Sequence, residues 1–262
     1  MHEREAREQG LNCLYQLIDL EKLGVGAEAL PQLLAAAEWM GFAGLNITHP
    51  CKQAILPLLT EVSDDARRIG AVNTVVLRNG RRIGHNTDWW GFAENFRRGL
   101  PDISLDRIVQ LGAGGGGSAT AYAALILGAG HVTIFDPIVE RAERLAAMLD
   151  SCFVQRASVG SNLTEAVASA DGLIHATPTG MAKYPGLPLP AELLRPELWV
   201  AEIVYFPLET ELLQLARRLG CRTLNGAGMA IFQAVQAFRL FTGREPDLER
   251  MERCFYSLGV LA

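Results

Sequence analysis

The sequence predicts an α/β protein with two domains, one of them a doubly wound parallel sheet. Strand-length apolar runs alternate with helix-length periodic segments along most of the chain. A glycine-rich loop at residues 112–117 follows one such run and precedes a helical segment. Asp136 ends the next predicted strand, about 20 residues beyond the loop. Together these three observations are typical of a dinucleotide-binding Rossmann domain.

Composition and charge narrow the class of protein. The chain has 262 residues, 49% of them hydrophobic, so it can bury a substantial core. Its net charge of −5 and the lack of long basic runs argue against nucleic acid as a partner. A charged N-terminal run, with no signal peptide and no apolar span of membrane length, predicts a cytoplasmic protein that does not bind membranes. The scattered cysteines lack the spacing of zinc or disulfide sites, so we expect free thiols and no bound metal.

The N-terminal half begins with a helix that reaches about Gln9, and the segment 12–19 then alternates polar and apolar residues as a strand does. Leucines and alanines at helical spacing predict a helix over 27–40, and the apolar run 42–45 predicts a buried strand. Pro50 suits the first turn of another helix. Ser63 favours the start of a further helix, and Gly70 ends it.

A β-hairpin is expected next. Residues 71–77 and 82–85 flank Asn79-Gly80, a pair that adopts the positive φ angles of a tight turn. A helix should then run from Asp88 to Arg98, with Gly99 as its stop signal.

The C-terminal half predicts the parallel sheet. Apolar runs indicate strands over 108–111, 132–136, 172–176 and 198–204. Helices are expected from the glycine loop to about Leu127 and from Glu140 to Leu149. Strands and helices that alternate in this way form a doubly wound sheet. The helical segment 226–241 follows the last obvious strand and is expected to pack back on the first domain.

The glycine loop predicts where the dinucleotide binds. It consists of Gly112, Ala113, Gly114, Gly115, Gly116 and Gly117. In such loops the first glycine permits a tight turn, the second lets the backbone approach a pyrophosphate, and the third allows close helix-to-strand packing. The amides at the helix start attract the anion. Asp136 can bind both ribose hydroxyls and would repel a phosphate on one of them, so we expect NAD as cofactor. The alternatives are a glycine turn that serves packing alone and an aspartate that only caps the helix after Pro137.

Two polar clusters indicate the chemistry. Residues 46–52, Asn-Ile-Thr-His-Pro-Cys-Lys, follow a predicted strand, and residues 86–88, Asn-Thr-Asp, precede a predicted helix. Beside a hydride cofactor, Lys52 can act as base towards an alcohol and as acid towards a ketone, while Asp88 orients it and shares the proton relay. Taken singly, a lysine in the first turn of a helix is more often solvated than catalytic. Asn-Thr-Asp before a helix is more often a helix cap than part of a catalytic site.

Over nearly its whole length the chain resembles the shikimate/quinate dehydrogenase family. Residues 46–52 are similar to the family's N-x-T-x-P-x-K, residues 70–74 to G-A-V-N-T, and residues 86–92 to N-T-D-x-x-G-F. Further agreement lies in 176–181 (A-T-P-T-G-M), in 204–210 (V-Y-F-P-L-E-T) and in Gly226-x-x-Met229 with Gln233-Ala234. The resemblance implies an N-terminal α/β substrate-binding and catalytic domain over 1–98 and 227–262, and an NAD-binding Rossmann domain over 99–226, with the active-site cleft between them.

The resemblance also implies roles for single residues. Lys52 and Asp88 would be the catalytic pair. The residues around a polyhydroxylated ring carboxylate would be Thr48, Asn73, Asp88, Tyr205 and Gln233. Besides the glycine loop and Asp136, the cofactor would contact Thr177, Pro178, Gly226 and Met229. Hydroxyl and amide side chains suit a polyol, although Tyr205 could instead belong to the core. His49 and His85 match no motif position, and we assign them no catalytic role.

The chain departs from the family pattern in three places. His175 stands where the family often has asparagine, near the expected nicotinamide wall. Asp136-Pro-Ile138 stands where NADP-dependent members have an asparagine followed by arginine, which again favours NAD. Family members normally begin with a strand and an S-x-S-P segment that holds the substrate carboxylate, and this sequence lacks both serines. Either it is part of a longer protein, or it binds its substrate with fewer donors.

The function implied by the resemblance is an NAD-dependent, reversible oxidation of a ring hydroxyl of shikimate or quinate to the 3-dehydro ketone. The expected partner is that small-molecule substrate, and the expected state is a monomer or a homodimer. Two alternatives stay open: a non-catalytic or weakly active ligand-binding protein of the same fold, and a dehydrogenase of another small hydroxy acid.

Overall fold

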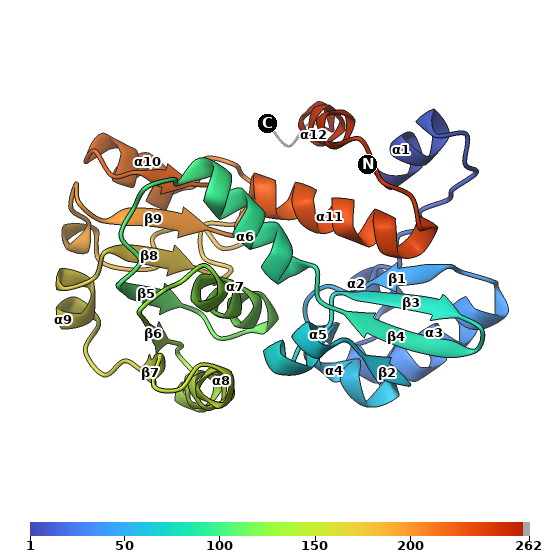
Figure 1. The fold of residues 1–262 in the computed structure, drawn as a ribbon, viewed down its shortest axis with the longest axis horizontal. Coiled ribbons are helices and arrows are strands. Elements are labelled where there is room, and N and C mark those ends of the chain that lie inside the picture. The colour runs from blue at the N-terminus through green and yellow to red at the C-terminus, as the bar shows by residue number, and fades with distance from the viewer. Residues whose placement is uncertain (259–262) are drawn as a thin grey trace. The chain divides into compact units, whose positions relative to one another are not determined.

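Residues 1–258 are described by the computed structural model, and they fall into two units (Figure 1). The first unit comprises Met1–Thr87 and Ala234–Leu258, and the second comprises Asp88–Gln233. The functional domains expected from the sequence, with boundaries at 98/99 and 226/227, stay a prediction.

A parallel sheet forms the centre of the second unit. Its strands are β5 (Arg107–Leu111), β6 (His131–Phe135), β7 (Ala157–Val159), β8 (Gly172–His175), β9 (Trp199–Glu202) and β10 (Thr223–Leu224). They lie in the order β10–β9–β8–β5–β6–β7, and every neighbouring pair is parallel. The chain leaves β5 in one direction and returns to its other side with β8, which creates the switch point where such sheets bind ligands. The predicted doubly wound parallel sheet is confirmed.

Helices cover both faces of this sheet, because successive side chains of a strand point to opposite sides. Val109 and Leu111 pack with residues of α9 (Leu163–Ala168) and α10 (Glu211–Arg218) in one apolar cluster. Gln110 points to the other face, where its Oε1 accepts a hydrogen bond from Thr120 of α7 (Gly115–Ile126) at 2.9 Å. That helix packs along α6 (Asp88–Gly99), and α8 (Val139–Cys152) follows β6; the short 3-10 helix η3 spans Ala191–Leu193.

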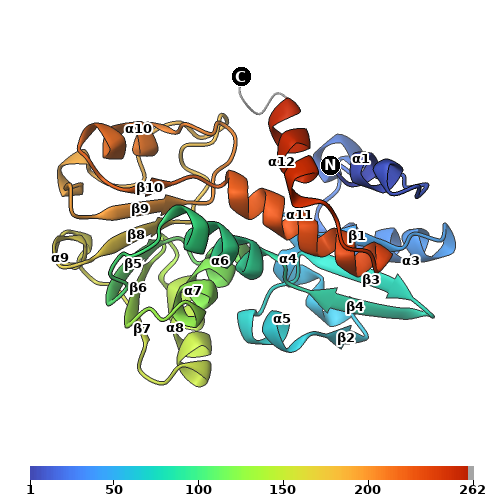
Figure 2. The ribbon, with the colours of Figure 1, turned by 45° about the horizontal axis from the view of Figure 1, so that its top comes forward.

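The first unit contains a smaller mixed sheet with the strand order β1–β3–β4–β2 (Figure 2). β3 (Thr74–Arg78) pairs antiparallel with both β1 (Gly44–Asn46) and β4 (Arg81–His85), and β4 pairs parallel with β2 (Glu61–Val62). The β3–β4 hairpin turns at Asn79 and Gly80, whose φ angles are 53° and 70°. This positive-φ turn confirms the hairpin predicted from the Asn-Gly pair.

Short helices surround that sheet. They are α1 (His2–Glu8), α2 (Leu20–Leu23), η1 (Ala27–Ala29), α3 (Leu30–Trp39), α4 (Cys51–Ala54), η2 (Leu56–Leu58), α5 (Asp64–Ile69) and α12 (Leu248–Ser257). The signals predicted for α5 are confirmed, because Ser63 Oγ accepts from the Ala66 amide at 3.3 Å and Gly70 closes the helix with a φ of 67°. α11 (Ala227–Thr242) contributes residues to both units. Within residues 1–258 there is no helix with the length and apolar character needed to cross a lipid bilayer.

The strand predicted over 12–19 is wrong. Residues 11–19 belong to no strand in the structure, and Leu14 and Leu17 are 82% and 70% exposed. The Tyr15 amide donates to the Glu3 carboxylate at 2.8 Å, and the Tyr15 ring stacks on His2 with centroids 4.9 Å apart. Alternation of polar and apolar residues predicts a strand only where a neighbouring strand supplies the backbone hydrogen bonds. Here the side chains of α1 hold the segment instead.

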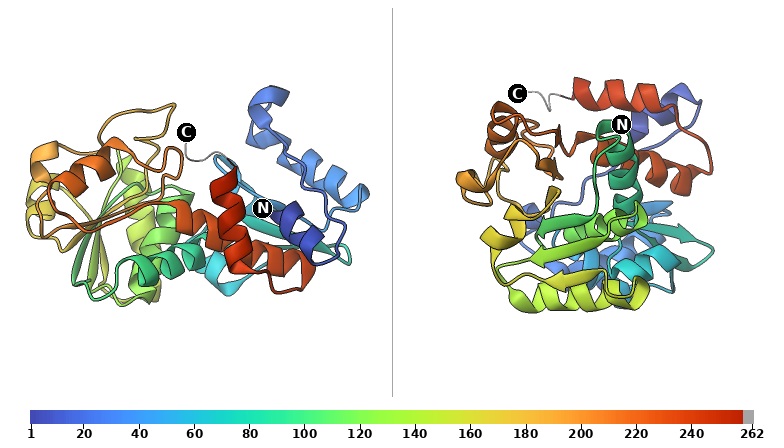
Figure 3. Two further views of the ribbon diagram at one scale, coloured as in Figure 1. Left: turned by 90° about the horizontal axis from the view of Figure 1, so that it is seen from above. Right: turned by 60° about the vertical axis from the view of Figure 1, so that its left-hand side comes forward.

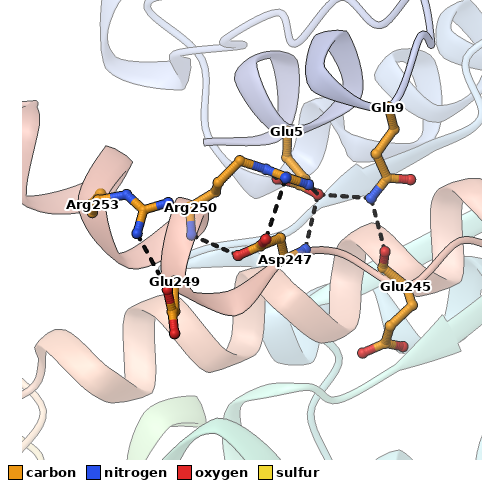
Figure 4. Close-up of polar contacts among 7 residues, drawn as sticks. All are labelled: Glu5, Gln9, Glu245, Asp247, Glu249, Arg250 and Arg253. Carbon is orange, nitrogen blue, oxygen red and sulfur yellow. Dashed lines mark hydrogen bonds and ion pairs between the residues drawn. The ribbon is translucent and has the colours of Figure 1, made fainter.

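A buried carboxylate joins the two ends of the first unit. Glu5 of α1 is 2% exposed and accepts hydrogen bonds from the Arg250 guanidinium at 2.8 and 2.9 Å, from the Asp247 amide at 2.9 Å and from Gln9 at 2.7 Å (Figure 4). α1 and α12 accordingly lie side by side (Figure 3). Burial raises the pKa of Glu5, but the hydrogen bonds from Arg250, Asp247 and Gln9 outweigh it and hold the pKa below its ordinary value.

Replacing Glu5 with glutamine should destabilise the protein by about 2 kcal/mol at neutral pH, because Arg250 loses its buried carboxylate partner. A carboxyl whose pKa is lowered by folding contributes stability above its unfolded pKa and loses that contribution as the pH falls through its folded pKa. Wild type should therefore lose stability below about pH 5, and Glu5→Gln should lose less over the same range. Thermal unfolding across this pH range provides the measurement.

Glu249→Gln is the matched control, since Glu249 is 83% exposed and pairs with Arg253 in the same helix at 3.4 Å. An equal loss of stability in the control, or an unchanged pH dependence in Glu5→Gln, would contradict the role of the buried carboxylate.

Candidate active site

The glycine loop lies between β5 and α7, at the carboxyl end of the parallel strands. Gln110 clamps its two ends, because its Nε2 donates to the carbonyl oxygens of Gly112 at 2.9 Å and Gly117 at 2.8 Å. Gln110 is fully buried, and its amide oxygen is bonded to Thr120. Gln110 was not among the predicted site residues, although a glutamine within the apolar strand 108–111 was a usable signal.

The space that a Cβ would find at each position explains why the loop is rich in glycine. Gly112 has a φ of 101°, and a Cβ there would lie 2.7 Å from the Ala176 carbonyl oxygen. A Cβ on Gly117 would overlap the Gly112 carbonyl oxygen. At Gly114, which precedes the first residue of α7, a Cβ would meet no protein atom within 4 Å. The loop is thus tight at both ends and open in the middle, as a pyrophosphate cradle at a helix start requires.

Asp136 connects the end of β6 to the glycine loop. Its Oδ2 accepts from the Ala113 amide at 2.8 Å, and its Oδ1 accepts from the Ile138 amide at 2.9 Å. The bond to Ile138 is the local contact that a capping aspartate makes, whereas the bond to Ala113 reaches across the sheet to the loop. A carboxylate can accept about four hydrogen bonds, so these two leave capacity for the hydroxyls of a ribose. These residues therefore fit a dinucleotide.

The chain after β8 runs directly beside the glycine loop. The Ala176 amide donates to the Leu111 carbonyl oxygen at 2.8 Å, and the Thr177 methyl lies 3.1 Å from the position that a Cβ on Gly112 would occupy. Pro178 follows and is exposed. The structure therefore brings Thr177 and the glycines, both predicted cofactor contacts, next to each other.

A chain of buried polar side chains ends at Thr177. The His175 ring lies 2.8 Å from Glu202 through Nδ1 and 2.5 Å from the Thr177 hydroxyl through Nε2. The other Glu202 oxygen accepts from the Thr210 hydroxyl at 2.5 Å. From the sequence, His175 was noted only because it stands where the family often has asparagine. Glu202 and Thr210 were not predicted as functional residues. An acidic residue inside the apolar run 198–204 was the available signal.

The remaining predicted residues of the second unit follow β9. Tyr205 is 49% exposed, so it is not part of the core. Gly226 is needed where the chain turns into α11, because a Cβ would overlap the Ile203 carbonyl oxygen. Met229 is buried and Gln233 is half-buried on the first turns of that helix.

Gly91 explains how α6 meets this part of α11. A Cβ on Gly91 would lie 2.7 Å from the Met229 carbonyl oxygen and 2.8 Å from the Gln233 amide nitrogen. Only glycine allows the two backbones to approach so closely. Asp88 is the first residue of α6, one turn before Gly91, and is 5% exposed.

In the first unit, Asn73 is the centre of a polar network. Its side chain is 3% exposed, its Nδ2 donates to the Thr87 hydroxyl at 2.9 Å, and its Oδ1 accepts from the Thr87 amide at 2.7 Å and from the Thr74 hydroxyl at 3.1 Å. Asn86 Nδ2 donates to the Ala71 carbonyl oxygen at 2.9 Å. These bonds fix residues 86 and 87, and Asp88 is the next residue of the chain.

The segment 46–52 is bonded to the same place. The Ile47 amide donates to the Asn73 carbonyl oxygen at 2.7 Å, and the Val72 amide donates to the Lys52 carbonyl oxygen at 2.8 Å. Thr48 is exposed, and Lys52 is half-buried on α4. The structure therefore gathers Thr48, Lys52 and Asn73 at one end of the smaller sheet. The other predicted site residues belong to the second unit.

Comparison with protein families gives two matches. The family described as "Shikimate dehydrogenase substrate binding domain" matches residues 1–75. The family described as "Shikimate 5'-dehydrogenase C-terminal domain" matches residues 226–253.

Known proteins of this kind are similar along almost the entire chain. The shikimate dehydrogenase (NADP(+)) of Streptomyces avermitilis is 61% identical over 96% of this chain and 87% of its own length. The quinate/shikimate dehydrogenase (NAD(+)) of Corynebacterium efficiens is 49% identical over 98% and 92%. Among solved structures, the quinate dehydrogenase from Corynebacterium glutamicum in complex with NAD superimposes with a TM-score of 0.90 at 47% identity, covering 98% of this chain and 92% of that one.

Proposed function

Because this chain belongs to the shikimate dehydrogenase family, we propose that it catalyses the reversible, NAD-linked oxidation of a ring hydroxyl of shikimate or quinate to the 3-dehydro ketone. The chain is an oxidoreductase of the NAD(P)-dependent kind. Relatives named for shikimate and relatives named for quinate and shikimate are both close to it, so we propose both acids as substrates.

The observation that carries the proposal is the polar end of the smaller sheet. Lys52, Thr48 and the buried Asn73 lie there together, and the bonds between Asn73 and Thr87 fix the chain immediately before Asp88. A lysine, a carboxylate and several hydroxyl and amide groups are the side chains that proton exchange with a polyol requires.

Each residue has a proposed role. Lys52 takes the proton of the reacting hydroxyl during oxidation and returns it during reduction, while Asp88 orients the lysine and shares the proton. Thr48, Asn73, Tyr205 and Gln233 hold the other ring hydroxyls. When bound, the nicotinamide supplies the hydride chemistry. The residues proposed to hold that cofactor are the loop 112–117, Asp136, Thr177, Pro178, Gly226 and Met229.

NAD is the proposed preferred nucleotide. The argument rests on Asp136, whose carboxylate is held at the end of β6 by the Ala113 and Ile138 amides. A fixed negative charge at the ribose position repels the 2′-phosphate of NADP, and neither Pro137 nor Ile138, the two residues after it, carries a positive charge that would compensate. Relatives named for either nucleotide are similar to this chain, so the ratio of kcat/KM for the two nucleotides is the quantity to measure.

Asp136→Asn should lower the NAD-to-NADP ratio of kcat/KM by about a hundredfold, because the amide removes the repulsion and weakens the bond to the ribose. Asp150→Asn is the matched control: Asp150 also accepts two backbone amides in this unit, from Arg156 at 3.1 Å and Ala157 at 3.0 Å. An unchanged ratio in Asp136→Asn, or an equal change in Asp150→Asn, would remove Asp136 from nucleotide selection.

A substrate panel tests the proposed function against its alternatives. Purified protein is incubated with shikimate, quinate and other small hydroxy acids under NAD and under NADP, and reduced nucleotide is followed. Turnover of shikimate or quinate supports the proposal, and turnover of another acid alone favours a different dehydrogenase. Ligand-induced thermal stabilisation without turnover would identify a binding protein instead.

A further inference from the structure

The buried side chains of Thr210, Glu202 and His175 form a chain that ends at Thr177. These three have no part in the function proposed above, yet they are groups that are costly to bury. His175 is 0% exposed, and Glu202 and Thr210 are each 1% exposed. Both Glu202 oxygens and both His175 nitrogens have hydrogen-bond partners. Apolar residues of similar size would stabilise a core at least as well as a buried carboxylate and imidazole, so core packing alone does not account for them.

For a carboxylate at Glu202 and a neutral imidazole at His175, the hydrogen bonds run in one direction. A carboxylate only accepts, so Nδ1 of His175 donates to one Glu202 oxygen and the Thr210 hydroxyl donates to the other. In a neutral imidazole Nε2 is then the acceptor. The Thr177 hydroxyl therefore donates to His175, while its oxygen accepts from the Thr179 amide at 3.2 Å.

The two contacts of the Thr177 hydroxyl oxygen fix the rotamer of this side chain. With its hydroxyl turned to His175 and Thr179, Thr177 presents its methyl towards Gly112, 3.1 Å from the position of a Cβ there. The side chain thereby forms an apolar wall beside the first glycine of the loop, and the donor of its hydroxyl is not offered to a ligand. The Thr177 hydroxyl oxygen also holds the turn 177–179, because it accepts from the Thr179 amide.

We infer that His175 is a positioning residue for dinucleotide binding: through Glu202 it is held in one tautomer and one orientation, and it locks Thr177 against the glycine loop. The inference rests on the proposed function, because it assigns this wall to the dinucleotide. It deepens that function by giving a role to three residues, His175, Glu202 and Thr210, that touch neither the reacting hydroxyl nor its proton.

Two variants separate this role from packing. In His175→Asn the amide can still donate to Glu202 from near the Nδ1 position, but it does not reach Thr177. In Thr177→Val the buried pair of His175 and Glu202 is untouched, the side-chain shape is kept, and only the hydroxyl is lost. We expect each to raise the Kd for NADH about tenfold, as the loss of one buried hydrogen bond would. The double variant should be no worse than either, because both remove the same link.

One control completes the set. His131→Asn removes the other side-chain-bonded histidine of this unit, whose Nε2 lies 2.8 Å from the Ser158 hydroxyl at the opposite end of the sheet, and should leave the Kd unchanged. NADH fluorescence gives the Kd without substrate, and thermal unfolding reports the fold of each variant.

The outcomes distinguish this inference from the proposed function. Wild-type Kd values in Thr177→Val or in a folded His175→Asn, or additive losses in the double variant, would overturn the positioning role even if wild type oxidises shikimate. Binding of NADH with the expected variant pattern but no oxidation of either acid would support the inference and defeat the proposed substrate. A wild-type protein that binds neither nucleotide would overturn both.

Discussion

Replacing Lys52 with alanine should lower kcat for shikimate or quinate by about a thousandfold, the range expected when a general acid–base group is removed. The lysine contributes its side chain to the chemistry and its backbone to the fold: the Val72 amide bonds to the Lys52 carbonyl oxygen, and alanine keeps that bond. Alanine also suits α4, so the variant should unfold at close to the wild-type temperature. Its Kd for NADH should stay within about twofold of wild type, since the nucleotide contacts are assigned to other residues.

Lys22→Ala is the matched control, because the Lys22 side chain is 79% exposed and its surface pair with Asp19 is long, at 3.9 Å. That variant should keep full activity. If Lys52→Ala turns over at the wild-type rate, Lys52 has no part in the mechanism and another group must move the proton.

The second large effect is expected at Gly114. Alanine there should raise the Kd for NADH by about a hundredfold, because its methyl would occupy the opening where the loop backbone approaches a pyrophosphate and would weaken several hydrogen bonds at once. The methyl meets no protein atom within 4 Å, so the unfolding temperature should change little. Loss of binding with an intact fold is the signature of a position kept open for a ligand.

Gly117→Ala provides the contrast. A methyl there overlaps the Gly112 carbonyl oxygen and crowds the Gln110 amide, so this variant should lose both stability and nucleotide binding. Measuring Kd and unfolding temperature for the pair separates a ligand cradle from a packing turn. If Gly114→Ala binds NADH as wild type does, the loop serves packing alone, which is the alternative that the sequence left open.

Local sequence signals predicted the parts of the fold that depend on a few neighbouring residues. The Asn79-Gly80 hairpin needs two positive φ angles, the start of α5 needs the Ser63 hydroxyl, and the strand–loop–helix at 107–126 needs glycines where a Cβ would clash. Each of these requirements can be met by only a few residue types, so the sequence shows them directly.

Features that depend on partners distant in the sequence were not predicted, or were predicted wrongly. Residues 12–19 have the alternation of a strand, but within this segment Tyr15 contacts the Glu3 and His2 side chains of α1. Alternation carries no information about such a partner. His175, Glu202 and Thr210 are separated by 27 and 8 residues, and only the folded sheet shows that they form one chain. The short strands β2 and β10, two residues each, offer too few positions for a pattern.

Among the predicted site residues, one group of neighbours lies in each unit. Thr177 and the glycine loop adjoin in the second unit, and Thr48, Lys52 and Asn73 adjoin in the first, because short backbone hydrogen bonds tie their segments together. Their roles in binding and catalysis stay proposals, since a role depends on a substrate that the sequence names only through resemblance.

The most direct test is to incubate the wild-type protein with shikimate or quinate and NAD, and to measure reduced nucleotide and ketone product together. The proposed function predicts NADH and the 3-dehydro ketone in equal amounts, faster with NAD than with NADP, and loss of both when Lys52 is replaced by alanine. Absence of reduced nucleotide from either acid with either cofactor, in a protein that is folded and binds NADH, would contradict it.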